Sequence, residues 1–371
     1  MSFPVAATRR RLIYAAGVVA LLAAGIRGTG QTQTRTASTF AARIAQLSEP
    51  SGFFDTDNLI SNEKSYLQVI PALQQAGVSG GAYIGVGPDQ NFSYIARIHP
   101  TIAFIVDVRR DNLLLHLLFK SLFAEAATRI EYVSLLFGRA PPPRPAEWTT
   151  AAAPQLVAYI DGQPAMSATR ALDARVDARL ATFGVPLSAQ DRATIHGFHH
   201  RFIDAGLRLK FESTGRSPRS YYPTYRDLLL ETDRQGHRWN YLAAEEDFAF
   251  VRGLEQRDLV IPVVGNLSGP TALTAIARLM RARGDRLSAF YTSNVEFYLF
   301  GDGTFPRFME NLDRLPRGGH AVVIRSVFGG FTAIDTAPGY YSASVVQPVD
   351  DLVRGFASGR YRSYSSLTSA R

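Results

Sequence analysis

The chain contains no cysteine among its 371 residues. It can therefore form no disulfide bond, use no thiolate nucleophile and build no thiolate metal site. Lysine is nearly absent too and occurs only as Lys64, Lys120 and Lys210, so the net charge of +8 comes mainly from arginine. A basic chain can bind nucleic acid. These arginines are scattered through the sequence and form no dense patch, so we expect no nucleic-acid partner.

Several catalytic signatures are missing as well. The sequence has no Gly-x-Ser-x-Gly elbow, no P-loop and no His-Glu-x-x-His helix, which argues against α/β-hydrolases, P-loop NTPases and zinc peptidases. His196, His199 and His200 have the spacing that can place imidazoles on one face of a helix. No acidic residue accompanies them at a matching position, so we expect no metal site.

The segment from Gly80 to Asn112 is the most informative part of the sequence. An apolar run ends in Gly85-Val86-Gly87, a short helical pattern follows, and a second apolar run ends at Asp107. The order of strand, glycine turn, helix, strand and acid is typical of the first half of a nucleotide-binding α/β domain. Asp107 lies 22 positions after Gly85, close to the roughly 20-residue spacing of an acid that accepts hydrogen bonds from ribose hydroxyls.

Asp89 and Gln90, which follow this turn, narrow the class of ligand that we expect. Gln90 stands where a dinucleotide fingerprint has its third glycine. Asp89 lies at the start of the predicted helix, where it can cap the N-terminus but would repel a pyrophosphate. We expect Asp89 and Gln90 to bind the cofactor. They favour a nucleoside with a cationic or zwitterionic tail, for which S-adenosylmethionine is the clearest candidate. The alternative is a tight turn that binds no ligand.

The N-terminus resembles an export signal. Arg9-Arg10-Arg11 precedes an uncharged stretch over residues 12–26, too short to span a membrane. The pattern is similar to a twin-arginine signal. We expect a signal peptide or anchor over residues 1–27 and a linker over residues 28–39. The protein is then periplasmic, or anchored facing the periplasm with its only membrane contact through this segment. A misplaced start codon is the alternative.

Alternating strands and helices occupy two separate stretches, residues 40–139 and 251–357. Their continuous apolar strands indicate a mostly parallel sheet with helices on both faces, so the expected fold is α/β, a Rossmann-like three-layer sandwich. Residues 140–250 are mostly helical and are expected to form an insertion or cap. The serine-rich residues 358–371 are expected to be a flexible tail.

Polar residues also follow the later strands. Open α/β sheets bind ligands at the carboxyl ends of their strands, so we expect Asn266, Asn294 and Glu296 to share one crevice with Asp107. In that crevice Asn266 would bind the cofactor, Asn294 the substrate, and Glu296 would act as general base. The alternative is that Asn266 only ends a strand and that Asn294 and Glu296 belong to a helix cap.

Two further residues are candidates for substrate binding. Arg109 follows Asp107 closely and can contact a substrate or form an ion pair. Tyr222 lies in an aromatic loop, where it can line a pocket or pack the predicted cap onto the core.

Four blocks of sequence carry a resemblance to a known group of proteins. They are GAYIGVGPDQNFSYIA, IAFIVDVRRDNLLLHLLFKSLF, LVIPVVGNLSGPTAL and AFYTSNVEFYLF. Together they resemble an uncharacterised bacterial family first seen in spirochaetes, whose members look like class I methyltransferases in fold. The resemblance covers most of residues 60–330 and assigns Gly85, Gly87 and Asp107 to an S-adenosylmethionine site. In one departure, Tyr83 stands where methyltransferases often have an acid.

This resemblance implies a methyltransferase acting on a small molecule or an envelope component. Because an exported enzyme would meet little S-adenosylmethionine, a second reading stays open. In that reading the protein keeps the fold but is a non-catalytic ligand-binding or envelope interaction protein.

Overall fold

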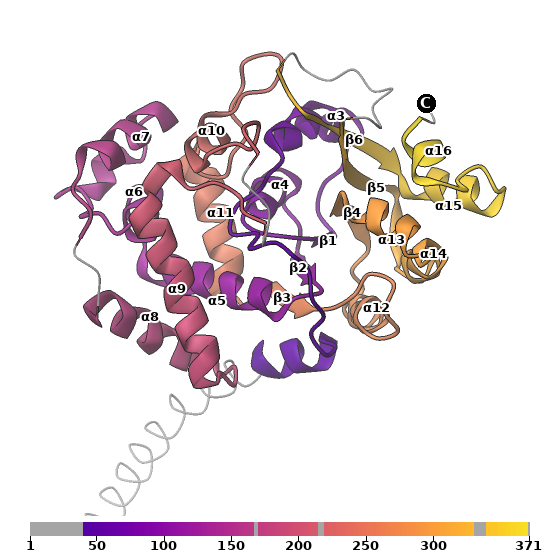
Figure 1. The fold of residues 1–371 in the computed structure, drawn as a ribbon, viewed down its shortest axis with the longest axis horizontal. Helices are drawn as coiled ribbons and strands as arrows, with labels where there is room; N and C mark the ends of the chain where they lie inside the picture. Colours follow the sequence, from indigo (N-terminus) through magenta and orange to yellow (C-terminus); the bar gives the residue numbers. More distant parts are fainter. Residues whose placement is uncertain (1–39, 167–169, 214–218, 330–338, 370–371) are drawn as a thin grey trace, which may run out of the picture.

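The computed structural model describes residues 40–166, 170–213, 219–329 and 339–369 (Figure 1). The expected export segment and linker lie outside these ranges. Within the described ranges, no helix is both long and apolar enough to cross a membrane.

Six strands form a single sheet in the order β3-β2-β1-β4-β5-β6. The strands are β1 (Ala82–Gly85), β2 (Ile102–Asp107), β3 (Val260–Val264), β4 (Leu287–Ser293), β5 (Arg317–Phe328) and β6 (Ser342–Pro348). The first five pair in parallel, and β6 runs antiparallel to β5. The prediction of an α/β fold with a mostly parallel sheet is confirmed. The sequence analysis did not predict β6, because this edge strand is only partly buried and has no continuous apolar run.

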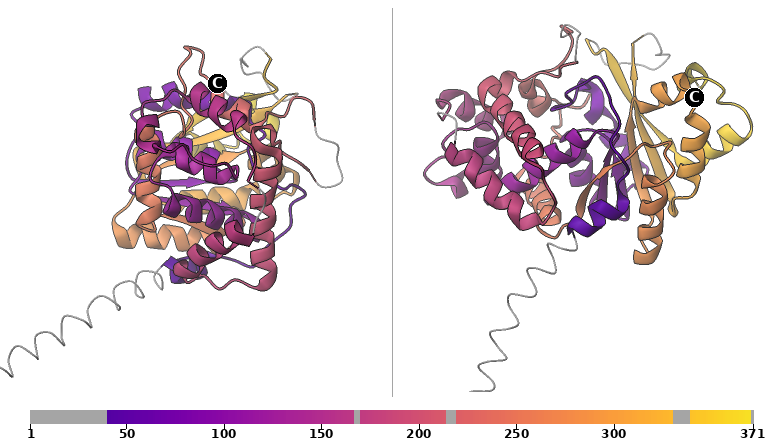
Figure 2. Two further views of the ribbon diagram at one scale, coloured as in Figure 1. Left: turned by 90° about the vertical axis from the view of Figure 1, so that its left-hand side faces the viewer. Right: turned by 60° about the horizontal axis from the view of Figure 1, so that its bottom comes forward.

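Buried, apolar strands occupy the centre of the molecule. All residues of β1 and β3 are buried, as are all but the last residue of β2. Helices lie on both faces of the sheet (Figure 2), so neither face of these strands meets water. Pro262 lies within β3, which is tolerated because β3 is an edge strand and the missing donor interrupts no ladder.

Helices make up the rest of the structure. In chain order they are residues 40–47, η1 (Lys64–Val69), α3 (Ile70–Gln75), α4 (Gln90–Ile98), α5 (Arg110–Glu125), α6 (Arg129–Leu136), η2 (Pro145–Trp148), α7 (Ala153–Gly162), α8 (Arg170–Phe183), α9 (Ala189–Ala205), η3 (Gly206–Arg208), α10 (Tyr225–Leu230), α11 (Glu245–Gln256), α12 (Ala272–Arg283), α13 (Val295–Gly301), α14 (Phe305–Asp313), α15 (Val349–Ala357) and α16 (Tyr364–Ser369). The break between α13 and α14 has a local cause, because Gly303 has φ +68° and Pro306 is the second residue of α14.

The helices of the expected insertion cover the outer side of α5. Both α8 and α9 pack against α5, and the rings of Phe119 and Phe202 meet edge to face across that contact. As a result α5 is buried on nearly all sides. The expected boundary at residue 250 falls inside α11, which packs against α4 and α5.

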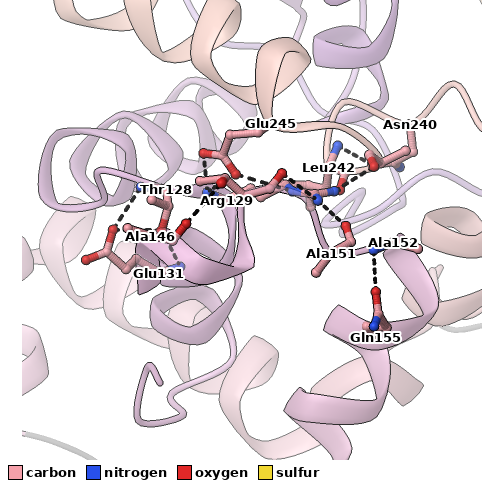
Figure 3. Close-up of polar contacts among 12 residues, drawn as sticks. Thr128, Arg129, Glu131, Ala146, Ala151, Ala152, Gln155, Asn240, Leu242 and Glu245 are labelled. Carbon is pink, nitrogen blue, oxygen red and sulfur yellow. Dashed lines mark hydrogen bonds and ion pairs between the residues drawn. The ribbon is translucent and has the colours of Figure 1, made fainter. Parts of the chain in front are cut away.

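A single arginine joins the start of α6 to two distant segments (Figure 3). Arg129 is 1% exposed. Its guanidinium donates to the carbonyl of Leu242 at 2.9 Å and to that of Ala151, and it pairs with Glu245 at 3.3 Å. The chain leading into α7 and the chain leading into α11 are therefore held at the same point.

The C-terminal region departs from expectation. The expected flexible tail contains α16, and Tyr364 and Leu367 on this helix are buried. Tyr364 also packs edge to face on Phe297 of α13, with ring centroids 5.4 Å apart. The serine-rich composition hides these apolar anchors, which are enough to dock a short helix. For residues 364–369, the expectation of a flexible tail is wrong.

Candidate functional site

A cavity of about 680 Å³ lies at the carboxyl ends of β1, β2, β3 and β4. The strand order reverses between β1 and β4, because β2 and β3 lie on one side of this pair and β5 and β6 on the other. Open α/β sheets bind ligands at such a reversal, and the volume lies in the range of small-molecule sites.

Most of the predicted site residues lie around this cavity. The lining includes Gly87, Gln90, Asp107, Arg109, Tyr222, Asn266 and Asn294, whereas Gly85, Asp89 and Glu296 are outside it. Residues from four strands thus meet at one edge of the sheet, as the strand-end pattern predicts.

The glycine turn after β1 is shaped by a residue that the sequence analysis missed. Gly87 has φ +83°, a conformation that favours glycine. Gly85 is needed for a different reason, because a Cβ there would lie 1.9 Å from Oδ1 of Asn91. The Asn91 amide nitrogen donates to the carbonyl of Val86 at 2.9 Å, and its oxygen accepts from the hydroxyl of Tyr83 at 2.8 Å. The space beside Gly85 is therefore filled by Asn91.

Asp89 is turned away from the cavity. Its carboxylate accepts hydrogen bonds from the hydroxyls of Tyr225 at 2.7 Å and Tyr241 at 3.3 Å. Burial raises the pKa of Asp89 to about 6, although both hydroxyls oppose the shift. The expectation that Asp89 caps α4 is wrong: its backbone is already helical, whereas a capping residue has an extended backbone that lets its side chain reach back.

Asp107 and Arg109 form a bidentate ion pair. Nε and Nη2 of Arg109 donate to the two carboxylate oxygens at 3.1 and 3.0 Å. Nη1 of Arg109 donates to the carbonyl of Thr56 at 2.6 Å. Arg109 therefore neutralises Asp107 and fixes the loop before η1 to the end of β2, while both side chains still line the cavity.

Glu296 lies outside the lining and faces an arginine. Nε and Nη2 of Arg325, on β5, donate to its two carboxylate oxygens at 2.5 and 3.1 Å. The side chains of Glu296 and Arg325 are 1% and 3% exposed. Before Glu296 could act as a base, this buried pair would have to open, which would leave an uncompensated charge.

The two asparagines at the strand ends differ. The Oδ1 atom of Asn266 accepts from the backbone and the hydroxyl of Ser268, both at 2.9 Å, which is the Asx turn that commonly ends a strand. Asn294 occupies the N-cap position of α13 but makes no capping hydrogen bond. Of the two, Asn294 is the side chain that is not held by a turn.

The cavity contains a carboxylate that the sequence analysis also missed. Glu63 precedes η1 and accepts hydrogen bonds from the hydroxyls of Tyr291, Ser293 and Ser326. No local pattern marks it, because all of these partners lie more than 220 residues further along the chain. Ser293 has φ +52°, a strained conformation for serine, and such strain is concentrated at functional sites.

Ten aromatic side chains line the cavity. They are Phe53, Phe54, Phe211, Tyr221, Tyr222, Phe297, Tyr298, Phe328, Tyr341 and Tyr364. Tyr221 and Tyr341 stack with ring centroids 3.8 Å apart. Aromatic faces bind planar rings and organic cations, so the lining suits a ligand with either group.

The three spaced histidines have other contacts. His196 lies 3.2 Å from Asp177 and His200 lies 3.0 Å from Asp173, while His199 bonds the carbonyl of Leu135. Throughout the part of the chain that the structure describes, no group of three or more acidic or histidine side chains is arranged to hold a metal ion.

Comparison with known proteins identifies the family. The sequence model of a family described as a domain of unknown function (DUF7790) matches residues 58–140 and 206–370. These residues make up more than half of the chain, so the chain belongs to this family. The matched residues include all six strands. Among curated proteins, none matches the chain.

Proposed function

We propose that this member of the DUF7790 family binds S-adenosylmethionine in the cavity between β1 and β4 and transfers its methyl group to a small molecule or an envelope component. One observation carries the proposal: a cavity of about 680 Å³ lies where the strand order of a mostly parallel sheet reverses. That is the expected ligand position in a Rossmann-like, methyltransferase-like sandwich.

The charges in the cavity support a cationic ligand over a pyrophosphate. Among the described residues, three acids line it, Glu63, Asp107 and Asp302, together with the arginines Arg109 and Arg219. Arg109 is already paired with Asp107. A dinucleotide would bring two negative charges to this lining, whereas S-adenosylmethionine brings a sulfonium and an ammonium.

The polar groups of the site also fit this cofactor. Gly87 presents bare backbone at the end of β1. Asp107 lies at the end of β2, where an acid can accept hydrogen bonds from ribose hydroxyls. When bound, S-adenosylmethionine supplies an electrophilic methyl group. The chain would position an attacking oxygen or nitrogen and exclude water, with Asn294 and Tyr222 on the substrate side.

Two carboxylates are candidates for the general base. Glu296 is the base that the sequence predicts, and it is held by Arg325. Glu63 is a carboxylate that lines the cavity itself, and burial raises the pKa of Glu63 above its ordinary value. A carboxylate with a raised pKa is a better proton acceptor, so within this proposal Glu63 is the stronger candidate.

The ion pairs of two acids favour a second function, in which the protein binds a ligand without catalysis. Asp107 and Glu296 are both engaged by arginines, as they would be in a protein that binds a ligand without catalysis. The expected export segment points the same way, because a periplasmic enzyme would have no resupply of S-adenosylmethionine.

Thermal unfolding with ligand tests the proposal. S-adenosylmethionine and S-adenosylhomocysteine should raise the melting temperature, since a ligand at a hundred times its Kd adds about 2.7 kcal/mol. Asp107→Ala should abolish the shift, and Asp302→Ala, which removes an exposed acid of the same lining, should keep most of it. No shift at millimolar nucleoside would refute the proposal. Binding without formation of S-adenosylhomocysteine from labelled cofactor would favour the non-catalytic function.

A further inference from the structure

The carboxylate of Glu63 is buried at the cavity wall, and among the residues that the structure describes no cationic side chain pairs with it. Glu63 is 1% exposed and lines the cavity. Its oxygens accept from Tyr291 at 2.5 Å and from the hydroxyls of Ser293 and Ser326. Burial raises the pKa of Glu63, the three hydroxyls lower it, and no cationic side chain of the described residues contributes. A buried charge normally has a counter-charge, and a cationic group that enters the cavity could supply one to Glu63.

Gln90 provides a second acceptor beside Glu63. The hydroxyl of Tyr291 has one proton, which it donates to Glu63. It can therefore only accept from Gln90, whose Nε2 lies 3.4 Å away. This leaves Oε1 of Gln90 buried with no hydrogen-bond partner. Gln90 is 6% exposed and lines the same cavity. A buried amide oxygen without a donor costs free energy, and a ligand N–H would satisfy it.

Aromatic rings also line the same cavity. Phe54 and Tyr298 meet edge to face with centroids 4.9 Å apart, and Phe297 packs on Tyr298. All three line the cavity. The faces of such rings attract cations, so the lining adds to the preference set by the two acceptors.

We propose that Glu63, Gln90 and Tyr291 form a subsite for a primary ammonium group. An N–H donor is required because Oε1 of Gln90 can only accept, which disfavours a quaternary ammonium or a sulfonium at this point. The inference rests on the proposed function for the rest of the ligand and names the charged group that this end of the cavity takes. An amine substrate carries that chemistry and leaves Glu63 able to accept its proton. The amino group of S-adenosylmethionine carries it too, and in that case Glu63 binds the cofactor and is not the base.

The test uses two small probes that differ in one group. 2-Phenylethylamine carries a ring and a primary ammonium, and 2-phenylethanol is its neutral counterpart. Calorimetric titration of the full chain should give a Kd at least about tenfold lower for the amine, the size of effect expected from a charged hydrogen bond. Glu63→Gln should remove this preference. Asp302→Asn removes the same charge from an exposed position of the same lining and should keep it.

A second variant covers the case in which Glu63→Gln does not fold. Gln90→Leu retains the Glu63 carboxylate but lacks the amide acceptor, and it should bind the amine several-fold more weakly while binding the alcohol as before. Equal binding of amine and alcohol by the unmodified protein would overturn the subsite. So would an amine preference that survives in both Glu63→Gln and Gln90→Leu.

Two nucleosides separate the subsite from the proposed function and identify the source of the ammonium. S-adenosylhomocysteine has a primary ammonium and 5′-methylthioadenosine lacks it. If 2-phenylethylamine displaces bound S-adenosylhomocysteine, the cofactor fills the subsite; if both bind together, an amine substrate does. Selective amine binding with no nucleoside binding supports the subsite and refutes the proposed cofactor. Nucleoside binding with no amine preference supports the cofactor and refutes the subsite.

Discussion

Replacement of Asp89 by asparagine should change how the stability of the fold depends on pH. Asp89 is buried beneath Tyr225 and Tyr241, and its pKa is raised from 3.8 to about 6. An acid with a raised folded-state pKa stabilises the fold most when it is protonated. Its contribution is therefore fully present below pH 3.8 and is lost as the pH rises through about 6.

The size of the effect follows from the two pKa values. The interval from 3.8 to about 6 corresponds to ~3 kcal/mol at about 1.4 kcal/mol per pKa unit. Asparagine keeps an oxygen that accepts from Tyr225 but carries no charge at any pH. Relative to the unmodified protein, Asp89→Asn should therefore gain about 3 kcal/mol between pH 4 and pH 8.

Urea unfolding over this pH range measures the gain. Glu255, whose pKa burial raises to about 7, and His116, whose pKa burial lowers to about 4, also titrate in this range. Glu255 and His116 are present in the unmodified protein and in Asp89→Asn. The difference in unfolding free energy between these two proteins therefore reports on Asp89 alone. Asp302→Asn, at an exposed position, should show no such trend. A difference that stays constant between pH 4 and pH 8, or that falls as the pH rises, would refute the reasoning.

Two other predictions concern the packing around the site, and each compares a pair of variants. Gly85→Ala places a Cβ 1.9 Å from Oδ1 of Asn91 and should lower the free energy of unfolding by about 1–3 kcal/mol. Gly253→Ala in α11, where no atom lies within 4 Å of the added Cβ, should raise the free energy of unfolding by up to about 1 kcal/mol. If Gly85→Ala and Gly253→Ala have equal effects, Asn91 does not fill the space beside Gly85. Glu296→Gln strands the guanidinium of Arg325 and should cost about 3–5 kcal/mol, much of which Glu296→Leu combined with Arg325→Met should restore. If the double variant is no more stable than Glu296→Gln, the pair does not control stability.

The fold could be predicted because its strands are locally recognisable. The segments that became β1, β2 and β3 are short apolar runs ended by glycine or an acid, and burial on both faces of a parallel sheet produces such runs. The cavity followed from a general rule that places ligands at the carboxyl ends of strands. That rule needs only the strand ends, which is why Asp107, Asn266 and Asn294 could be assigned to one crevice.

Orientation of side chains could not be predicted, because it depends on partners far away in the chain. Asp89 turns inward because it accepts hydrogen bonds from Tyr225 and Tyr241. Both tyrosines lie more than 130 residues later in the chain, so no local pattern reveals the contact. Glu296, at the start of α13, is held by Arg325 on β5, and the two lie 29 residues apart in the chain. Glu63 has no local pattern that distinguishes it from a surface acid. Each of these roles arises from a contact that only the folded chain brings together.

The two ends of the segment that the family model does not match lie next to each other. Residues 141–205 fall between the matched ranges. Arg139 precedes this segment, and its guanidinium donates to the carbonyl of Ile203 at 3.4 Å, near the end of the segment. The path of the chain would therefore allow excision of the whole segment, with a short linker across the gap. Excision would nevertheless destabilise the packing, because α5 would then expose Phe119 and its apolar neighbours to water. The segment is therefore part of the core of this protein, because it supplies the apolar surface that covers α5.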